Sequence, residues 1–387
     1  MFTWFSSWRG RVFILGALVT TGIFGSVEKA SAGSLYYWDT NGSSYGAGTA
    51  PSGTWGEDPN WNQQADGTGN TVGWANDNHA VFAAGDDATQ AYTVTVSGTR
   101  NVGDIHFDNG APTLQGGTLG LDNGNRLISV ANGITAVINT PLTAKNANGV
   151  IRVTKYKQGT LILGGNNSYS GETMIEGGIL QLGAAERIPN TSRLILGNGD
   201  TRTNDGFVDT PATFHTGGFN ETLGQLQLTG PNPNIARTID FGNGASALVF
   251  ANSSSVDWEG LPLTIVNYTL GVDSLRFGTS SSGLTATQLA SIRFADFGNV
   301  PGKIDQNGFV TPAGPTLIGV TGGGTANTTI SWNSIYGSTY RVQYKANLNE
   351  AFWTDLVPDV VAFDSTASAT DNTSGGNERY YRVILLP

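Results

Sequence analysis

Residues Gly159–Gly183 read GTLILGGNNSYSGETMIEGGILQLG, and this stretch decides the fold that the sequence predicts. Within it, side chains suited to a core recur two positions apart, so the members of each pair point to the same face of an extended strand. The pairs are Leu161 with Leu163, Thr173 with Ile175, and Leu180 with Leu182. Three short strands in so brief a segment predict one turn of a coiled β-sheet.

Glycine and asparagine separate the first of these strands from the second. The residues are Gly164, Gly165, Asn166, Asn167 and Gly171. Such residues tolerate the left-handed backbone angles that sharp corners use. We therefore expect them to adopt positive φ values in the corners of the coil.

The composition favours an ordered, turn-rich β protein. Glycine accounts for 54 of 387 residues and charged residues for only 13%, whereas hydrophobic residues reach 39%, which is enough apolar surface for a core. The formal net charge of −10 argues against nucleic acid as a partner, because polyphosphate binding depends on Lys and Arg. The chain contains no cysteine, which excludes disulfides and thiolate metal sites.

The segment that opens this section resembles the autotransporter-associated β-strand repeat. The residues that carry the resemblance are Leu161, Leu163, Asn167, Tyr169, Gly171, Thr173, Ile175, Leu180 and Gly183. The resemblance implies a bacterial, passenger-like protein exported to the cell surface. The sequence finishes in Leu385, Leu386 and Pro387 rather than in an aromatic-ended barrel strand, so we expect a passenger-like protein without a barrel.

Residues 1–32 have the form of a signal peptide. Arg9 and Arg11 precede an apolar run from Val12 to Phe24, and residues 30–32 (Ala-Ser-Ala) match a signal-peptidase site. The alternative is a membrane anchor, but this run is shorter than the roughly 18–20 apolar residues that span a bilayer. We expect cleavage after Ala32, no transmembrane segment in the mature chain, and an extracellular or outer-surface location, with the periplasm as the alternative.

We divide the rest of the chain into three parts. Residues 33–90 predict a Trp- and Gly-rich β cap, residues 91–311 a parallel, β-helix-like solenoid, and residues 312–387 a small β-sandwich after a Pro/Gly linker. The predicted fold class is all-β, with a short helix at residues 285–292. A large β-sandwich is the alternative for the body, because it has similar short strands.

The last part resembles a fibronectin type III module. Its predicted strands are residues 329–332, 339–345, 353–356, 367–370 and 379–385. In that resemblance Trp332 is the core tryptophan of the second strand, and Tyr381 is the tyrosine of a late strand. The part is short for the family, so one edge strand is expected to be missing.

Catalytic and metal-binding motifs find little support in the sequence. His79, His106 and His215 have no metal-ligand spacing, and the glycine- and aspartate-rich stretch 197–206 departs from a calcium loop because Arg202 occupies a ligand position. We predict no cofactor, no metal site and no assignable catalytic residue. Asp104, Asp108 and Asp122, followed by Arg126 and Arg152, form the best candidate for a polysaccharide lyase or hydrolase cluster, and solvated turns are the alternative.

Three tryptophans of the predicted cap are candidates for stacking on sugar rings: Trp55, Trp61 and Trp74. An exposed indole offers a flat apolar face to a pyranose, although burial is the commoner fate of tryptophan. The leading hypothesis is a non-catalytic structural or adhesion-type surface protein, with extracellular polysaccharide or surface matrix as its partner. The alternatives are a β-helix polysaccharide lyase or hydrolase, and a carbohydrate-binding protein.

Overall fold

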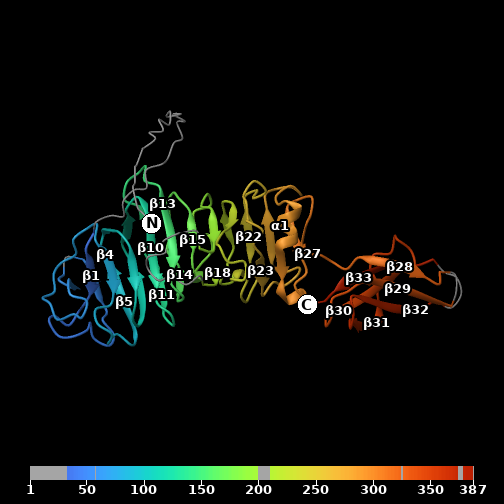
Figure 1. Ribbon diagram of the computed structural model, residues 1–387, viewed down its shortest axis with the longest axis horizontal. Coiled ribbons are helices and arrows are strands. Elements are labelled where there is room, and N and C mark those ends of the chain that lie inside the picture. Colours follow the sequence, from blue (N-terminus) through green and yellow to red (C-terminus); the bar gives the residue numbers. More distant parts are fainter. Residues whose placement is uncertain (1–32, 57, 199–209, 324–325, 374–377, 387) are drawn as a thin grey trace, which may run out of the picture.

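The structure, a computed structural model, describes residues 33–56, 58–198, 210–323, 326–373 and 378–386. Figure 1 shows that residues 35–312 build one elongated body and that residues 317–385 form a smaller unit beyond one end of it. The predicted signal peptide lies outside the described residues and stays a prediction. None of the helices described is both long enough and apolar enough to cross a bilayer.

The elongated body is a coil of parallel β-sheets. Sheet A has the strand order β20 (Leu226–Leu228), β17 (Leu194–Leu196), β15 (Thr173–Ile175), β13 (Ile151–Tyr156), β10 (Gly124–Val130), β7 (Ile105–Phe107), β4 (His79–Phe82), β1 (Leu35–Trp38) and β3 (Trp61–Asn62). Sheet B has the order β2 (Gly53–Trp55), β5 (Ala91–Val96), β8 (Ala111–Gln115), β11 (Thr135–Ile138), β14 (Thr160–Leu163), β16 (Gly178–Leu182), β18 (Ala212–His215), β21 (Arg237–Asp240), β23 (Leu263–Val266) and β25 (Ile292–Phe294).

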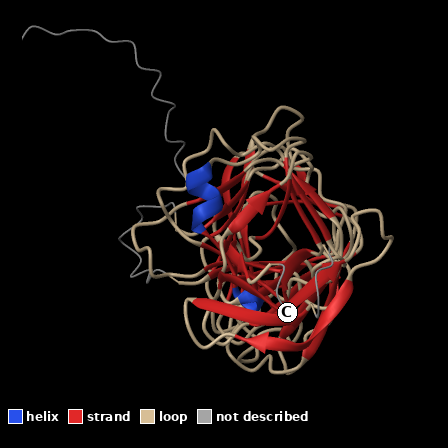
Figure 2. Cartoon of the chain, turned by 90° about the vertical axis from the view of Figure 1, so that its right-hand side faces the viewer, coloured by secondary structure: helices blue, strands red, loops and turns tan. Residues whose placement is uncertain are grey.

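Two smaller sheets form the third side of the coil. Sheet C has the order β12 (Leu142–Ala144), β9 (Thr118–Leu121) and β6 (Thr99–Val102), and sheet D has the order β19 (Glu221–Leu223), β22 (Ala247–Phe250), β24 (Ser274–Phe277), β27 (Phe309–Pro312) and β26 (Gly302–Ile304). In a full turn the chain passes from sheet A to sheet B, then along the third side, and back to sheet A. Figure 2 shows these strands arranged around a common axis. The prediction of an all-β parallel solenoid is confirmed.

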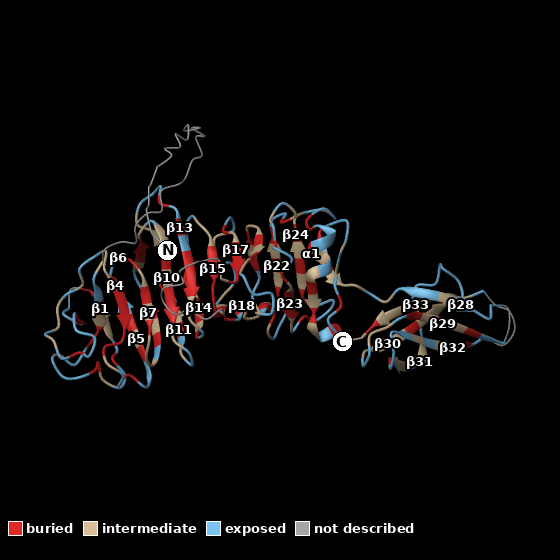
Figure 3. Cartoon of the chain, in the orientation of Figure 1, coloured by how far each residue is buried: buried red, intermediate tan, exposed pale blue. Residues whose placement is uncertain are grey.

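The core is made by the alternation seen in the sequence. In sheet B, Leu161 pairs with Leu180 and Leu163 with Leu182 in register, and all four side chains are fully buried. Because every strand side chain that points inward sits above an equivalent one in the previous turn, apolar contacts continue along the axis. Figure 3 shows buried positions recurring in the strands of successive turns.

The prediction that the corner glycines and asparagines adopt positive φ values is wrong. Within residues 159–183 the structure has a positive φ at Gly178 (69°), and not at Gly164, Gly165, Asn166, Asn167 or Gly171. Glycine is needed at several of these corners because successive turns approach closely. A Cβ at Gly171 would lie 2.1 Å from the carbonyl oxygen of Ile151, and one at Gly165 would lie 2.6 Å from that of Thr140.

Asn167 connects three turns of the coil at a corner that has no strand pairing. Its Oδ1 accepts a hydrogen bond from the Leu142 N–H (2.8 Å), and its Nδ2 donates one to the Arg187 carbonyl (2.8 Å). Asparagine can do both because its amide carries a donor and an acceptor. In the corner between β14 and β15, the Asn167 side chain therefore supplies hydrogen bonds between successive turns that strand pairing does not supply there.

Antiparallel strands lie at both ends of the coil. At the N-terminal end β3 pairs with β1, and at the other end β27 pairs with β24 and β26. The helix α1 (Ala286–Ser291) and the 3-10 helix η2 (Ala295–Phe297) lie close to this second end, and α1 begins at a capping box formed by Thr285 and Gln288. Such elements cover strand edges that would otherwise pair with another molecule.

The C-terminal unit consists of two antiparallel sheets. One has the order β28 (Leu317–Thr321), β29 (Asn327–Asn333) and β32 (Thr366–Asn372), and the other has the order β31 (Thr354–Val361), β30 (Thr339–Lys345) and β33 (Tyr380–Leu385). Trp332 and Tyr340 are buried between them, with ring centroids 5.7 Å apart. The sequence missed β28. The fibronectin type III resemblance and the domain boundaries stay predictions.

Candidate binding groove on the solenoid

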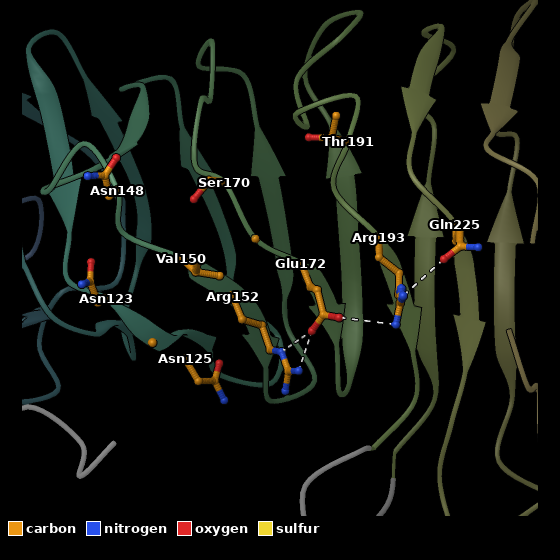
Figure 4. Close-up of a pocket in the computed structure, with 12 residues that line it drawn as sticks. Asn123, Asn125, Asn148, Val150, Arg152, Ser170, Glu172, Thr191, Arg193 and Gln225 are labelled. Carbon is orange, nitrogen blue, oxygen red and sulfur yellow. Dashed lines mark hydrogen bonds and ion pairs between the residues drawn. The ribbon is translucent and has the colours of Figure 1, made fainter. Parts of the chain in front are cut away.

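An open groove of about 1060 Å³ crosses the solenoid where successive turns lead into sheet A. Its lining comes from the residues at or just before β10, β13, β15, β17 and β20, which are neighbours in that sheet. The lining residues are Asn123, Gly124, Asn125, Asn148, Val150, Arg152, Ser170, Gly171, Glu172, Thr191, Arg193 and Gln225. Figure 4 shows ten of these side chains on consecutive turns. We call this feature the sheet A groove.

A single column of side chains runs along the sheet A groove. Its members, one from each turn, are Asn125, Arg152, Glu172, Arg193 and Gln225. The parallel register pairs Asn125 with Arg152. It also pairs Val153 with Thr173 and Thr173 with Leu194, and these three residues directly follow Arg152, Glu172 and Arg193. Because equivalent positions of neighbouring strands are about 4.8 Å apart, these residues are neighbours along the axis.

The charges of the column bind one another. Arg152 donates from Nε to Glu172 Oε2 (2.7 Å), and its Nη2 lies 2.5 Å from the same oxygen. Arg193 Nη1 lies 3.6 Å from Glu172 Oε1, and its two terminal nitrogens donate to the side-chain oxygens of Gln225 and Gln227 (3.2 Å each). Figure 4 shows the chain of contacts from Arg152 to Gln225. Both guanidinium groups are therefore engaged within the protein.

The remaining side chains of the groove are uncharged. Asn148 and Thr191 are exposed, and the Val150 side chain is 68% exposed. Amides and hydroxyls both donate and accept hydrogen bonds. The groove can therefore bind a ligand that offers many hydroxyl groups and a small apolar face.

The three aspartates of the candidate cluster each contact a different basic side chain, and Asp104 also lies 3.9 Å from Arg126. Asp104 lies beside His79 (3.3 Å), Asp108 pairs with Lys157 (2.9 Å), and Asp122 pairs with Lys145 (3.1 Å). Burial by itself raises the pKa of Asp104, but hydrogen bonds from His79 and the Leu127 N–H, together with the nearby Arg126 charge, bring that pKa below its usual value. Among the residues described, no group of three or more His, Asp or Glu side chains is arranged to hold a metal ion. The stretch 197–206 lies largely outside the residues that the structure describes.

The three histidines each have a different nearest polar partner. His79 is beside Asp104, His215 Nε2 is 3.9 Å from Asp240, and His106 Nδ1 is 2.8 Å from the hydroxyl of Ser129. The sequence did not single out the His106–Ser129 pair. Ser129 is only 1% exposed, so its hydroxyl faces packed protein and not the solvent.

His106 leads to a prediction about pH. Burial lowers its pKa below the ordinary 6.5, outweighing the Asp104 and Asp108 charges that raise it. Because the unfolded chain then binds more protons just below pH 6.5, the free energy of unfolding is expected to fall as the pH drops from 6.5 towards the lower folded pKa. His106→Gln should remove this contribution, so the slope of the free energy of unfolding against pH below 6.5 should differ between the native chain and the variant, measured by urea unfolding at a series of pH values. An unchanged slope in the variant would contradict this assignment. The stabilisation that Asp104 provides is lost only as the pH falls below the ordinary aspartate pKa of 3.8, so the effects of His106 and Asp104 occur in different pH ranges.

The tryptophans proposed for sugar stacking pack on one another. Trp55 and Trp61 are fully buried, and Trp74 is half-buried. Ring centroids are 4.9 Å apart for Trp55 and Trp61, 4.8 Å for Trp55 and Trp74, and 4.6 Å for Trp61 and Trp74. Other rings therefore cover the indoles of Trp55 and Trp61 in this structure. Sugar stacking stays a prediction that needs these side chains to become exposed.

Buried ionisable groups inside the coil form hydrogen bonds with its backbone. Lys155 is fully buried, and its Nζ donates to the carbonyls of Tyr156, Lys157 and Gly177 (3.1, 2.7 and 3.0 Å), while burial lowers its pKa to about 7. The carboxyl group of Glu221 accepts hydrogen bonds from the backbone N–H groups of Arg187 and Ile188, and burial raises its pKa to about 8. These contacts satisfy backbone groups at the corners, so they explain why Lys155 and Glu221 are buried.

Part of the chain is similar to a known repeat family. A family model of the passenger-associated-transport-repeat matches residues 154–182. The chain carries a passenger-associated-transport-repeat. In the structure this passenger repeat runs from the middle of β13 through β14 and β15 to the end of β16. The resemblance to an autotransporter-associated repeat is thereby confirmed.

The passenger repeat is accompanied by wider homology. Over 191 residues the chain is 31% identical to the adhesin BmaC autotransporter of Brucella suis biovar 1 (strain 1330). The match covers 49% of this chain but only 5% of that protein, so the chain corresponds to a small part of the relative. No solved structure matches the chain.

Proposed function

We propose that this chain is an adhesin-type surface protein that is exported, binds extracellular polysaccharide or surface matrix, and does not cleave what it binds. The observation that carries the proposal is the passenger repeat, which lies within a continuous parallel solenoid and within a chain homologous to an autotransporter adhesin. Repeating turns of this kind build long surfaces suited to extended ligands.

The arrangement of ionisable groups supports the non-catalytic part of the proposal. Asp104, Asp108 and Asp122 each pair with a different basic side chain. Polysaccharide hydrolysis uses two carboxyl groups that face each other across the scissile bond. In the sheet A groove the carboxylate of Glu172 contacts two arginines, and the groove lining contains no second carboxyl group to face it.

Incubation of the purified chain with immobilised polysaccharides tests the proposal. We expect retention on at least one polysaccharide, with no new reducing ends and no unsaturated products in the supernatant. Release of such products would instead support a β-helix lyase or hydrolase. Brief protease treatment of intact cells, followed by immunoblotting, should remove the protein from the surface. A protein found only in the cytosol would contradict the export that we propose.

A further inference from the structure

The sheet A groove has the length and direction of a site for an extended chain. Its column takes one side chain from each of five turns, Asn125, Arg152, Glu172, Arg193 and Gln225. At about 4.8 Å per turn the column spans about 19 Å. A ligand that contacts all five turns therefore lies along the solenoid axis and across the strands.

The charged side chains of the groove contact one another before any ligand arrives. Its lining contains two arginines and one glutamate, which leaves one net positive charge. Glu172 contacts both guanidinium groups, and Gln225 occupies further donors of Arg193. A carboxylate on a ligand would have to displace Glu172 or lie beside it. Each alternative costs electrostatic free energy, since like charges repel and a broken pair leaves its partner unsatisfied.

The accessible groups are those that recognise hydroxyls. Asn148, Val150 and Thr191 are exposed and line the groove, as Figure 4 shows. Small-molecule sites combine apolar surface with a few placed polar groups. Val150 supplies apolar contact for the C–H groups of a sugar ring, and the amide and hydroxyl groups supply hydrogen bonds. The chain's net charge of −10 also disfavours a polyanion at low ionic strength.

We infer that the sheet A groove is the polysaccharide site of this protein and that its ligand is an uncharged, hydroxyl-rich polysaccharide lying along the solenoid axis. This inference rests on the proposed function, since it names where that binding occurs and which class of polysaccharide binds. The column orients the ligand, and Asn148, Val150 and Thr191 make the contacts that are free to form.

Affinity electrophoresis of the full chain tests this inference. The gels contain galactomannan or xyloglucan as uncharged probes, or polygalacturonate as an acidic probe. The groove variant combines Asn148→Ala, Val150→Ala and Thr191→Ala. The matched control makes the same three replacements at exposed positions outside the groove lining: Asn243→Ala, Val272→Ala and Thr279→Ala. All six positions are exposed, so both variants are expected to fold.

The native chain should be retarded by an uncharged probe, with little effect of salt. The groove variant should bind that probe at least about tenfold more weakly, which corresponds to about 1.4 kcal/mol, and the control should bind normally. Equal binding by the groove variant would overturn the location and leave the proposed function standing. Tighter, salt-sensitive binding to polygalacturonate would overturn the ligand class. No retardation by any probe would overturn the proposed function together with this inference.

Discussion

Trp61→Ala is expected to destabilise the N-terminal end of the solenoid by about 3–5 kcal/mol, the usual cost of deleting a buried aromatic side chain. Trp61 is fully buried and contacts the rings of Trp38, Trp55, Trp74 and Phe82, with centroids 4.6–5.5 Å away. Its removal leaves a cavity at the point where β3 covers the edge of sheet A. Hydrogen exchange of the β1–β4 amides, together with denaturant unfolding, measures the loss.

Trp61→Phe is the matched control for this prediction. In the part of the chain that the structure describes, the indole Nε1 of Trp61 has no hydrogen-bond partner. Phenylalanine therefore keeps most of the packing and sacrifices no hydrogen bond, so we expect a loss of only about 1 kcal/mol. An exposed, sugar-stacking Trp61 would give the opposite pattern: Trp61→Ala would abolish polysaccharide retention and leave the unfolding transition unchanged. That result would contradict the packed cap.

Gly171→Ala is expected to cost about 3 kcal/mol, the upper end of the usual range for overpacking. The new Cβ would lie 2.1 Å from the Ile151 oxygen and 2.5 Å from the Ile151 carbonyl carbon, and backbone atoms in a paired strand cannot rotate away. The turns that carry β13 and β15 must then separate. Because Gly171 lies between Ser170 and Glu172 in the sheet A groove, polysaccharide binding should weaken as well.

Gly56→Ala provides the comparison within the same solenoid. A Cβ there would meet the Cβ of Ser97 at 3.4 Å, an ordinary van der Waals distance, and Gly56 has no positive φ. Its effect on the free energy of unfolding should stay within about 0.5 kcal/mol. Both variants are compared by denaturant unfolding followed by circular dichroism. Equal stability of the two variants would show that the turns do not approach as closely at Gly171 as the structure has it.

These two predictions come from places where residue type alone pointed elsewhere. Tryptophan is compatible with both stacking on sugars and burial, and the sequence does not show which rings meet. Glycine is compatible with both a left-handed angle and a close approach. At Gly171 the cause is a carbonyl that lies 20 positions away in the sequence, that of Ile151. Local sequence contains no information about such a neighbour.

The sheet A groove illustrates the same limit. The sequence named Arg152 only as part of a cluster with Asp104, Asp108 and Asp122, and it missed Glu172, Arg193 and Gln225. Successive members of the column are 27, 20, 21 and 32 residues apart, so no constant period reveals them. One signal was present: Arg152, Glu172 and Arg193 each directly precede an inward-pointing strand residue, namely Val153, Thr173 and Leu194.

The sequence by itself determined which side chains of the passenger repeat point inward, because inward and outward alternation is a local property of each strand. Leu161, Leu163, Leu180 and Leu182 needed no knowledge of distant residues to be placed inside. Only the tertiary structure decided which polar side chains share a surface, which glycines are crowded and which tryptophans are covered. Those properties depend on the register between turns, and loops of unequal length set that register.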